Sequence, residues 1–78
     1  MSKAKPPACL MYAGTLGHRW ASTYTDSDGV EHLRCECNEG PHAVETADED
    51  EAAGRPARIW NRTRKGWREV TRSLAMIS

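Results

Sequence analysis

Cysteine and histidine are the residues of this chain whose types and spacing could do chemistry. Two of its three cysteines, Cys35 and Cys37, stand one residue apart in the stretch LRCECNEGPH, residues 33–42. An odd number of cysteines cannot all pair internally, and the start of the chain has no apolar run of signal-peptide length. We therefore expect reduced thiols in the cytoplasm, where clustered cysteines are more often metal ligands than disulfides.

A β-hairpin over residues 18–37 is expected to bring these side chains together. The segments HRWASTYT and VEHLRCEC have strand-like composition and flank Asp-Ser-Asp-Gly, a strong turn signal. A four-residue loop pairs Thr25 with Val30, and a two-residue turn leaves the same residues on a common face, whereas an odd loop length separates them. The predicted face holds His18, Trp20, Leu33, Cys35 and Cys37.

The hairpin suggests a zinc site. Zinc in structural sites takes four ligands, usually cysteine and histidine. Cys9 can reach back across a glycine-containing loop, and His42 is a substitute ligand if the strand bends near Glu36. Free thiols and a redox-active pair are the alternatives, although the neighbouring carboxylates oppose thiolate formation. The predicted ligands are Cys9, His18, Cys35 and Cys37.

The same stretch resembles the small zinc-hairpin proteins of actinobacteria and their phages. In that pattern a cysteine precedes Gly-His-x-Trp, and Cys-x-x-Cys follows on the return strand. Cys9, His18, Trp20 and Cys35 match it, while Cys37 departs by one residue and leaves the fourth ligand open between Cys37 and His42. The resemblance covers Cys9 to about Gly40. It implies a zinc-stabilised β fold and a phage origin, and it implies no activity.

The remaining elements complete a small domain. Thr46 followed by Glu49 fits a capping box and predicts a short acidic helix at about 47–53. Residues 58–77 read either as a second hairpin, closing with a helical turn near Leu74, or as one amphipathic helix. We predict a mainly β (α+β) zinc-stapled domain over residues 8–78 behind a flexible lead, 1–7. A chain of this size has a thin core, which explains the need for a staple.

Binding is the expected function. No catalytic motif is evident, so we expect a non-enzymatic module that docks on a larger protein as an adaptor, inhibitor or assembly component, in the host cytoplasm if it is phage-encoded. No membrane span is expected, and exposed strand edges allow self-association. The alternative is nucleic-acid binding, although zero net charge weakens it. The residues expected to contact nucleic acid or another partner are Arg58, Trp60, Arg62, Arg64, Lys65, Trp67, Arg68 and Arg72.

Overall fold

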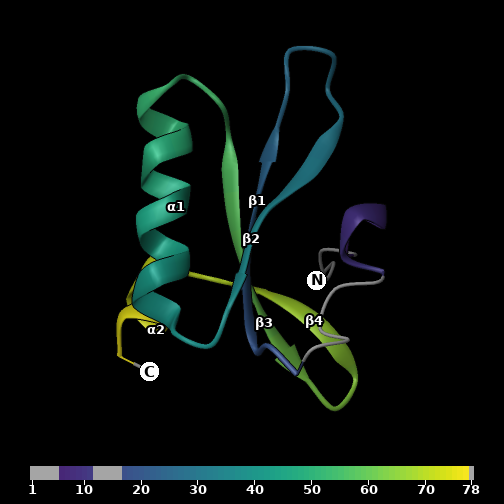
Figure 1. Ribbon diagram of the computed structural model, residues 1–78, viewed down its shortest axis with the longest axis vertical. Coiled ribbons are helices and arrows are strands. Elements are labelled where there is room, and N and C mark those ends of the chain that lie inside the picture. The colour runs from purple at the N-terminus through teal and green to yellow at the C-terminus, as the bar shows by residue number, and fades with distance from the viewer. Residues whose placement is uncertain (1–5, 12–16, 78) are drawn as a thin grey trace.

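The protein is a four-stranded antiparallel sheet with two α-helices on one face and a short 3-10 helix on the other (Figure 1). The computed structural model describes residues 6–11 and 17–77. Most of the predicted lead, 1–7, and of the loop after Cys9 lies outside these ranges. The strand order is β2-β1-β3-β4, and the long helix joins the edge strand β2 to β3. The elements are η1 (Ala8–Leu10), β1 (Trp20–Thr25), β2 (Glu31–Cys37), α1 (Gly40–Ala52), β3 (Ala57–Thr63), β4 (Gly66–Val70) and α2 (Arg72–Met76).

The first hairpin is confirmed, but its register differs from the prediction. Thr25 pairs with Glu31 rather than Val30, because the Asp26 carboxylate accepts backbone N–H groups of Asp28 and Val30, each at 2.9 Å, and lengthens the loop. A β-bulge then leaves Arg34 unpaired. Each irregularity shifts the pairing by one residue, and together they shift it by two.

The two shifts leave the cysteines on the predicted face and move their neighbours. Trp20 pairs with Cys37 rather than Cys35, and Ser22 pairs with Cys35. Between the turn and the bulge the alternation is inverted. Leu33, expected beside the cysteines, therefore packs on the opposite side of the sheet. His18 lies before the start of β1 and has no partner in this register.

Helix α1 is longer than predicted and begins seven residues earlier. The added first turn contains Gly40 and Pro41, because proline is well tolerated in the first helical turn, where no intrahelical partner is needed for its missing N–H. Thr46 is therefore not a cap. It lies within the helix, donates to the Ala43 carbonyl at 3.0 Å, and bonds the buried Ser22 hydroxyl of β1 at 2.6 Å.

The second hairpin is also confirmed, and the single helix over 58–77 is wrong. Thr63 pairs directly with Gly66, so the turn consists of Arg64 and Lys65. Gly66 has φ 111, a value that favours glycine. The helical turn expected near Leu74 is present as α2, where the Thr71 hydroxyl accepts the Leu74 N–H at 3.2 Å.

Two small apolar clusters lie on opposite faces of the sheet. Because most side chains of the helix-side cluster are small, α1 lies close to the strands. That cluster comprises Trp20, Ala43, Val44, Ala47, Ile59 and Ala75, with Cys37, Ala57 and Val70 at its margin. The second cluster, on the η1 side, comprises Leu10, Ala21 and Trp60, with Cys9, Leu33 and Trp67 at its margin.

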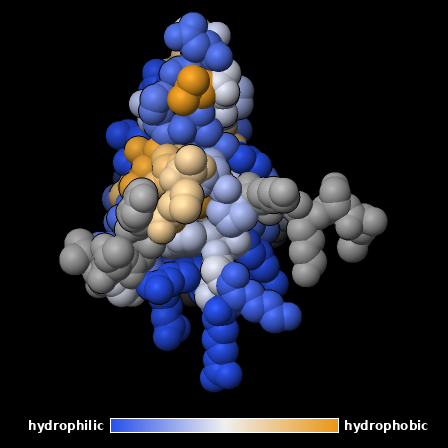
Figure 2. All heavy atoms as spheres, turned by 90° about the vertical axis from the view of Figure 1, so that its right-hand side faces the viewer, coloured by the Kyte–Doolittle hydropathy of each residue, from blue (hydrophilic) through white to orange (hydrophobic). Residues whose placement is uncertain are grey.

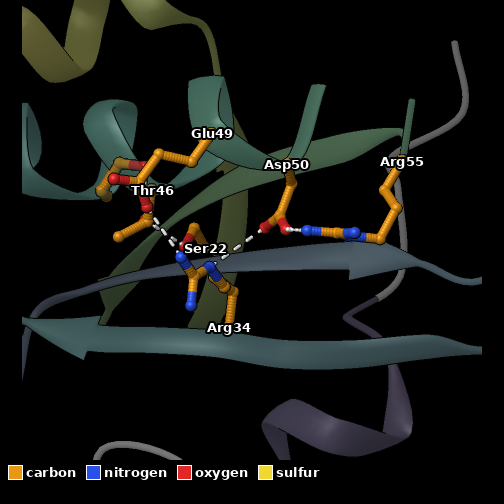
Figure 3. A network of polar contacts seen from close by, with 7 residues as sticks. Ser22, Arg34, Thr46, Glu49, Asp50 and Arg55 are labelled. Carbon is orange, nitrogen blue, oxygen red and sulfur yellow. Dashed lines mark hydrogen bonds and ion pairs between the residues drawn. The ribbon is translucent and has the colours of Figure 1, made fainter. Parts of the chain in front are cut away.

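A buried carboxylate ties α1 to the sheet (Figure 3). The Asp50 side chain is 1% exposed. Its Oδ1 accepts hydrogen bonds from Nε and Nη2 of Arg55 at 3.0 and 2.7 Å. Its Oδ2 lies 3.3 Å from Nε of Arg34 on β2. Arg34 also donates to Glu49 at 2.7 Å. The residue left unpaired by the bulge is thus the one that binds the helix.

We expect Asp50→Ala to lower the free energy of unfolding by about 2 kcal/mol. Breaking a fully buried ion pair costs about 3–5 kcal/mol, and the loss is smaller here because Arg34 and Arg55 are partly exposed and can hydrate. Urea unfolding measures the difference. Asp48→Ala is the matched control, because Asp48 is exposed and its pair with Arg72 contributes less than about 1 kcal/mol. Equal losses in the two variants would contradict this role for Asp50.

Candidate functional site

Cys35 and Cys37 lie together at the end of β2. They share the face of the sheet that α1 covers, and both are half-buried. The Cys37 thiol donates to the Glu39 carbonyl at 3.3 Å, and the Cys35 thiol lies 3.7 Å from the Glu36 carbonyl. The prediction that strand geometry brings these two sulfurs to one side is therefore confirmed.

The other predicted ligands lie elsewhere. Cys9 is in η1 and packs in the cluster on the opposite face of the sheet. His18 Nδ1 lies 3.5 Å from the Glu36 carboxylate, and His42 is exposed in the first turn of α1. Among residues 6–11 and 17–77, no three or more histidine, cysteine or acidic side chains are grouped so as to hold a metal. The structure thus unites two of the four predicted ligands and does not bring Cys9 to them; the zinc site stays a prediction.

Neither Cys9 nor Cys35 is an activated nucleophile. Burial, together with the nearby Cys37 thiol, raises the pKa of Cys35, and Glu36 adds to this effect. Burial also raises the pKa of Cys9, with Glu31 contributing. Thiols of raised pKa are mostly protonated at neutral pH and react slowly. Nucleophilic attack and metal binding both use the thiolate, so a metal bound here would have to displace the thiol proton.

The basic side chains divide into two groups. Four arginines make ion pairs within the fold: Arg34 and Arg55 with the end of α1, Arg58 with Glu31 and Glu69, and Arg72 with Asp48 and Glu51. Two of them, Arg58 and Arg72, belong to the predicted partner-binding set. Their charges are balanced by neighbouring carboxylates, so both are better described as structural.

The second group gathers at the end of the sheet formed by the β3–β4 turn. Arg64 and Lys65 form that turn, Arg62 and Arg68 flank it, and the Arg19 carbonyl accepts the Arg62 N–H at 2.8 Å. All five side chains are exposed. Figure 2 shows long hydrophilic side chains projecting from the lower end of the molecule, where this hairpin lies in Figure 1. We call Arg19, Arg62, Arg64, Lys65 and Arg68 the basic end.

Arg19 was missed by the sequence reasoning. It is 42 residues from Asn61, yet the Asn61 amide donates to its carbonyl at 3.1 Å because β1 and β3 are neighbours. The sequence signals a basic residue at the start of a strand, but no local pattern indicates that β1 pairs with β3. Its place beside the second hairpin follows only from the tertiary fold.

The two tryptophans of the basic segment have different environments. Trp60 is fully buried, donates its Nε1–H to the Thr23 hydroxyl at 3.0 Å, and lies under the Arg58 guanidinium, 4.7 Å from the ring centroid. It cannot stack on a base, so its assignment to the binding set is wrong. Trp67 is half-buried and pairs with Arg62 across β3 and β4. One aromatic side chain therefore remains available beside the basic end.

Comparisons with known proteins give no further guidance. No protein-family model matches the chain, and neither the curated proteins nor the solved structures include a match. The resemblance to zinc-hairpin proteins therefore stays a prediction. Of the helices in residues 6–11 and 17–77, none is sufficiently long and apolar to cross a membrane.

Acid should weaken the fold through Glu31. Burial alone would raise the pKa of Glu31, but hydrogen bonds from Arg58 and Thr23 lower it below the ordinary value of 4.5. Its contribution is therefore present above pH 4.5 and is lost as pH falls through the folded pKa. We expect Glu31→Gln to be less stable at pH 7 and to lose less stability on acidification, as measured by urea unfolding at several pH values.

Arg58→Met tests the cause of the same effect. Without Arg58 the lowering of the Glu31 pKa should largely disappear, and the acid dependence should shrink as in Glu31→Gln. Some dependence remains in both variants, because the hydrogen bond from His32 also lowers the pKa of Asp26. An acid response of Glu31→Gln as steep as that of the wild type would refute the assignment.

Proposed function

We propose that this chain is a small binding module that takes single-stranded nucleic acid at its basic end. The observation that supports this proposal is the gathering of exposed cations around the β3–β4 turn. Arg34, Arg55, Arg58 and Arg72 are balanced by carboxylates, while the exposed cations of the basic end cluster around one turn. Zero net charge thus conceals a local positive field.

The basic end can follow a phosphate backbone. Arg64 and Lys65 project from a two-residue turn, Arg62 and Arg68 lie on β3 and β4, and Arg19 directly precedes the neighbouring strand β1. Neighbouring strands lie about 4.8 Å apart, so the cations are spread over a width that successive phosphates can reach. Each phosphate contact releases condensed counterions and so contributes binding free energy.

Trp67 supplies a sequence-tolerant contact. Its ring is on the η1 face of β4, opposite Arg62, and is only partly covered. An aromatic ring flanked by arginines is a common platform for an unpaired base, and stacking contributes about 1–3 kcal/mol per base. A duplex hides its bases from such a ring, which is why single strands are the favoured ligand.

Docking on a larger protein through the acidic helix has less support. The carboxylates of Asp48, Glu49, Asp50 and Glu51 are each paired with an arginine of the same chain. A surface whose charges are balanced internally exerts little pull on a basic partner. We therefore propose binding of nucleic acid without an enzymatic step. Failure to bind nucleic acid in the test below would favour a protein partner.

The salt dependence of binding is the first test. If all five cations of the basic end contact phosphates, the logarithm of affinity for a labelled single-stranded oligonucleotide should fall with a slope of about −3.5 against the logarithm of salt. That slope corresponds to roughly a hundredfold loss between 50 and 200 mM salt. Arg64→Ala with Lys65→Ala should reduce the slope to about −2. Fluorescence anisotropy gives the affinities.

Arg72→Ala is the matched control, because it also removes a positive charge but one already paired with Asp48 and Glu51. Its slope should equal that of the wild type. Equal slopes in the Arg72 variant and the turn variant, both below the wild-type value, would indicate net charge alone and contradict the proposed surface. Failure of the wild type to bind at low salt would direct attention to a protein partner.

Stacking on Trp67 is the second test. Trp67→Leu keeps an apolar side chain against the η1-side cluster but removes the ring. We expect the affinity to fall by about 1 kcal/mol or more with an unchanged salt slope, because stacking releases no counterions. Far-UV circular dichroism checks that the fold survives. An affinity of Trp67→Leu equal to that of the wild type would exclude Trp67 from the interface.

A further inference from the structure

The thiol pair at the end of β2 remains outside the proposed nucleic-acid surface. Cys35 and Cys37 face the α1 side of the sheet, whereas Trp67 and Arg62 face the η1 side. Both thiols are half-buried, so they are reachable from solvent yet held by their surroundings. Two adjacent sulfurs on a rigid strand require a chemical explanation of their own.

A disulfide fits this spacing poorly. Alternate residues of a strand have Cα atoms about 6.6–6.8 Å apart, which is at the upper limit for a disulfide. An ion between the sulfurs relaxes this requirement, because two metal–sulfur bonds of about 2.3 Å each span up to about 4.6 Å. The backbone thus suits a bridging ion better than a direct sulfur–sulfur bond.

The immediate surroundings are compatible with a cation. The Glu36 carboxylate stands between the two cysteines in the chain and lies 3.5 Å from Nδ1 of His18, so a negative charge is close to the pair. The Cys37 thiol donates to the Glu39 carbonyl at 3.3 Å, which holds this sulfur at the junction of β2 and α1.

The bulge in β2 is what creates the pair's position. Without it, the five-residue loop would place Cys35 and Cys37 on the η1 face, away from Trp20. With it, Cys37 pairs with Trp20 and packs at the margin of the helix-side cluster. A single irregularity therefore fixes the sulfurs beside the start of α1.

We propose that Cys35 and Cys37 form a two-thiolate site for a soft monovalent cation, Cu(I). Zinc usually requires four ligands, and no third ligand-type side chain joins the pair in the described part of the chain. Thiolates prefer soft ions, and Cu(I) is stable with two of them. On binding, both thiols lose their protons to solvent and each sulfur forms one bond to the ion, with no change of oxidation state.

The test is an anaerobic titration of the reduced full-length chain with Cu(I) against a chromophoric Cu(I) chelator. We expect the wild type to withdraw a single equivalent of copper from the chelator. Cys35→Ser and Cys37→Ser should each lose that ability. Cys9→Ser is the matched control: it removes a half-buried thiol on the opposite face of the sheet, and it should bind copper as the wild type does.

The competing zinc site gives a different pattern. If Cys9→Ser or His18→Ala abolished metal binding as fully as Cys35→Ser, the four-ligand site would be correct and the two-thiolate site would be overturned. Copper retained by Cys35→Ser would also overturn it. Far-UV circular dichroism of each variant excludes unfolding as the cause. As a second readout, a trivalent arsenical that bridges adjacent thiols should add once to the wild type and to Cys9→Ser, and not to the other two variants.

Discussion

The pairing of Asp50 with Arg34 and Arg55 is the interaction that connects the parts of this fold. Asp50 is in the last turn of α1, where the helix dipole disfavours a negative charge, and it is almost fully buried. Both costs are offset only if cations lie close by. Arg34 reaches it from β2 and Arg55 from the connection to β3, so one carboxylate holds the helix against the strand before it and the segment after it (Figure 3).

This arrangement has consequences for the rest of the surface. The acids at the end of α1 attract the arginines that can reach them, and Arg72 of α2 pairs with Asp48 and Glu51 in the same way. On the η1 side, Glu31 and Glu69 hold Arg58 over the ring of Trp60. The cations of the basic end gather instead around the β3–β4 turn. The charge asymmetry of the surface thus follows from the packing of the helix.

The two hairpins could be predicted because their turns have local sequence signals. The register of the first hairpin has no such signal and could not be predicted. Asp-Ser-Asp-Gly fixed the first turn, and the glycine at residue 66 fixed the second. The register of the first hairpin required knowledge of a loop extension and a bulge, neither of which has a sequence signature as strong as the turn itself. They shift the strand by one residue each, so the cysteines were placed on the correct face although their partners were not.

The helix and the candidate site show the same limit. Gly40-Pro41 is equally consistent with a break and with a first helical turn, and only the packing of Ala43, Ala47 and Val44 on the sheet decides between them. Within a run of acids, nothing distinguishes the buried Asp50 from the exposed Glu51. The burial of Trp60 depends on the pairing of β1 with β3, a contact between segments about 40 residues apart.

The apolar core is small, so an ion bound at its margin would add a cross-link that the core lacks. The helix-side cluster contains Trp20 and Ile59 as its larger members, and the η1-side cluster is built around Trp60. Each cluster is accompanied by a buried polar contact, Ser22 with Thr46 on the helix side and Trp60 with Thr23 on the η1 side; such contacts specify one arrangement but add little net stability. An ion held by Cys35 and Cys37 would lie at the margin of the helix-side cluster, at the junction of β2 and α1. It would therefore fasten the end of the strand to the start of the helix, opposite the end that Asp50 secures, and leave the η1-side cluster to apolar packing.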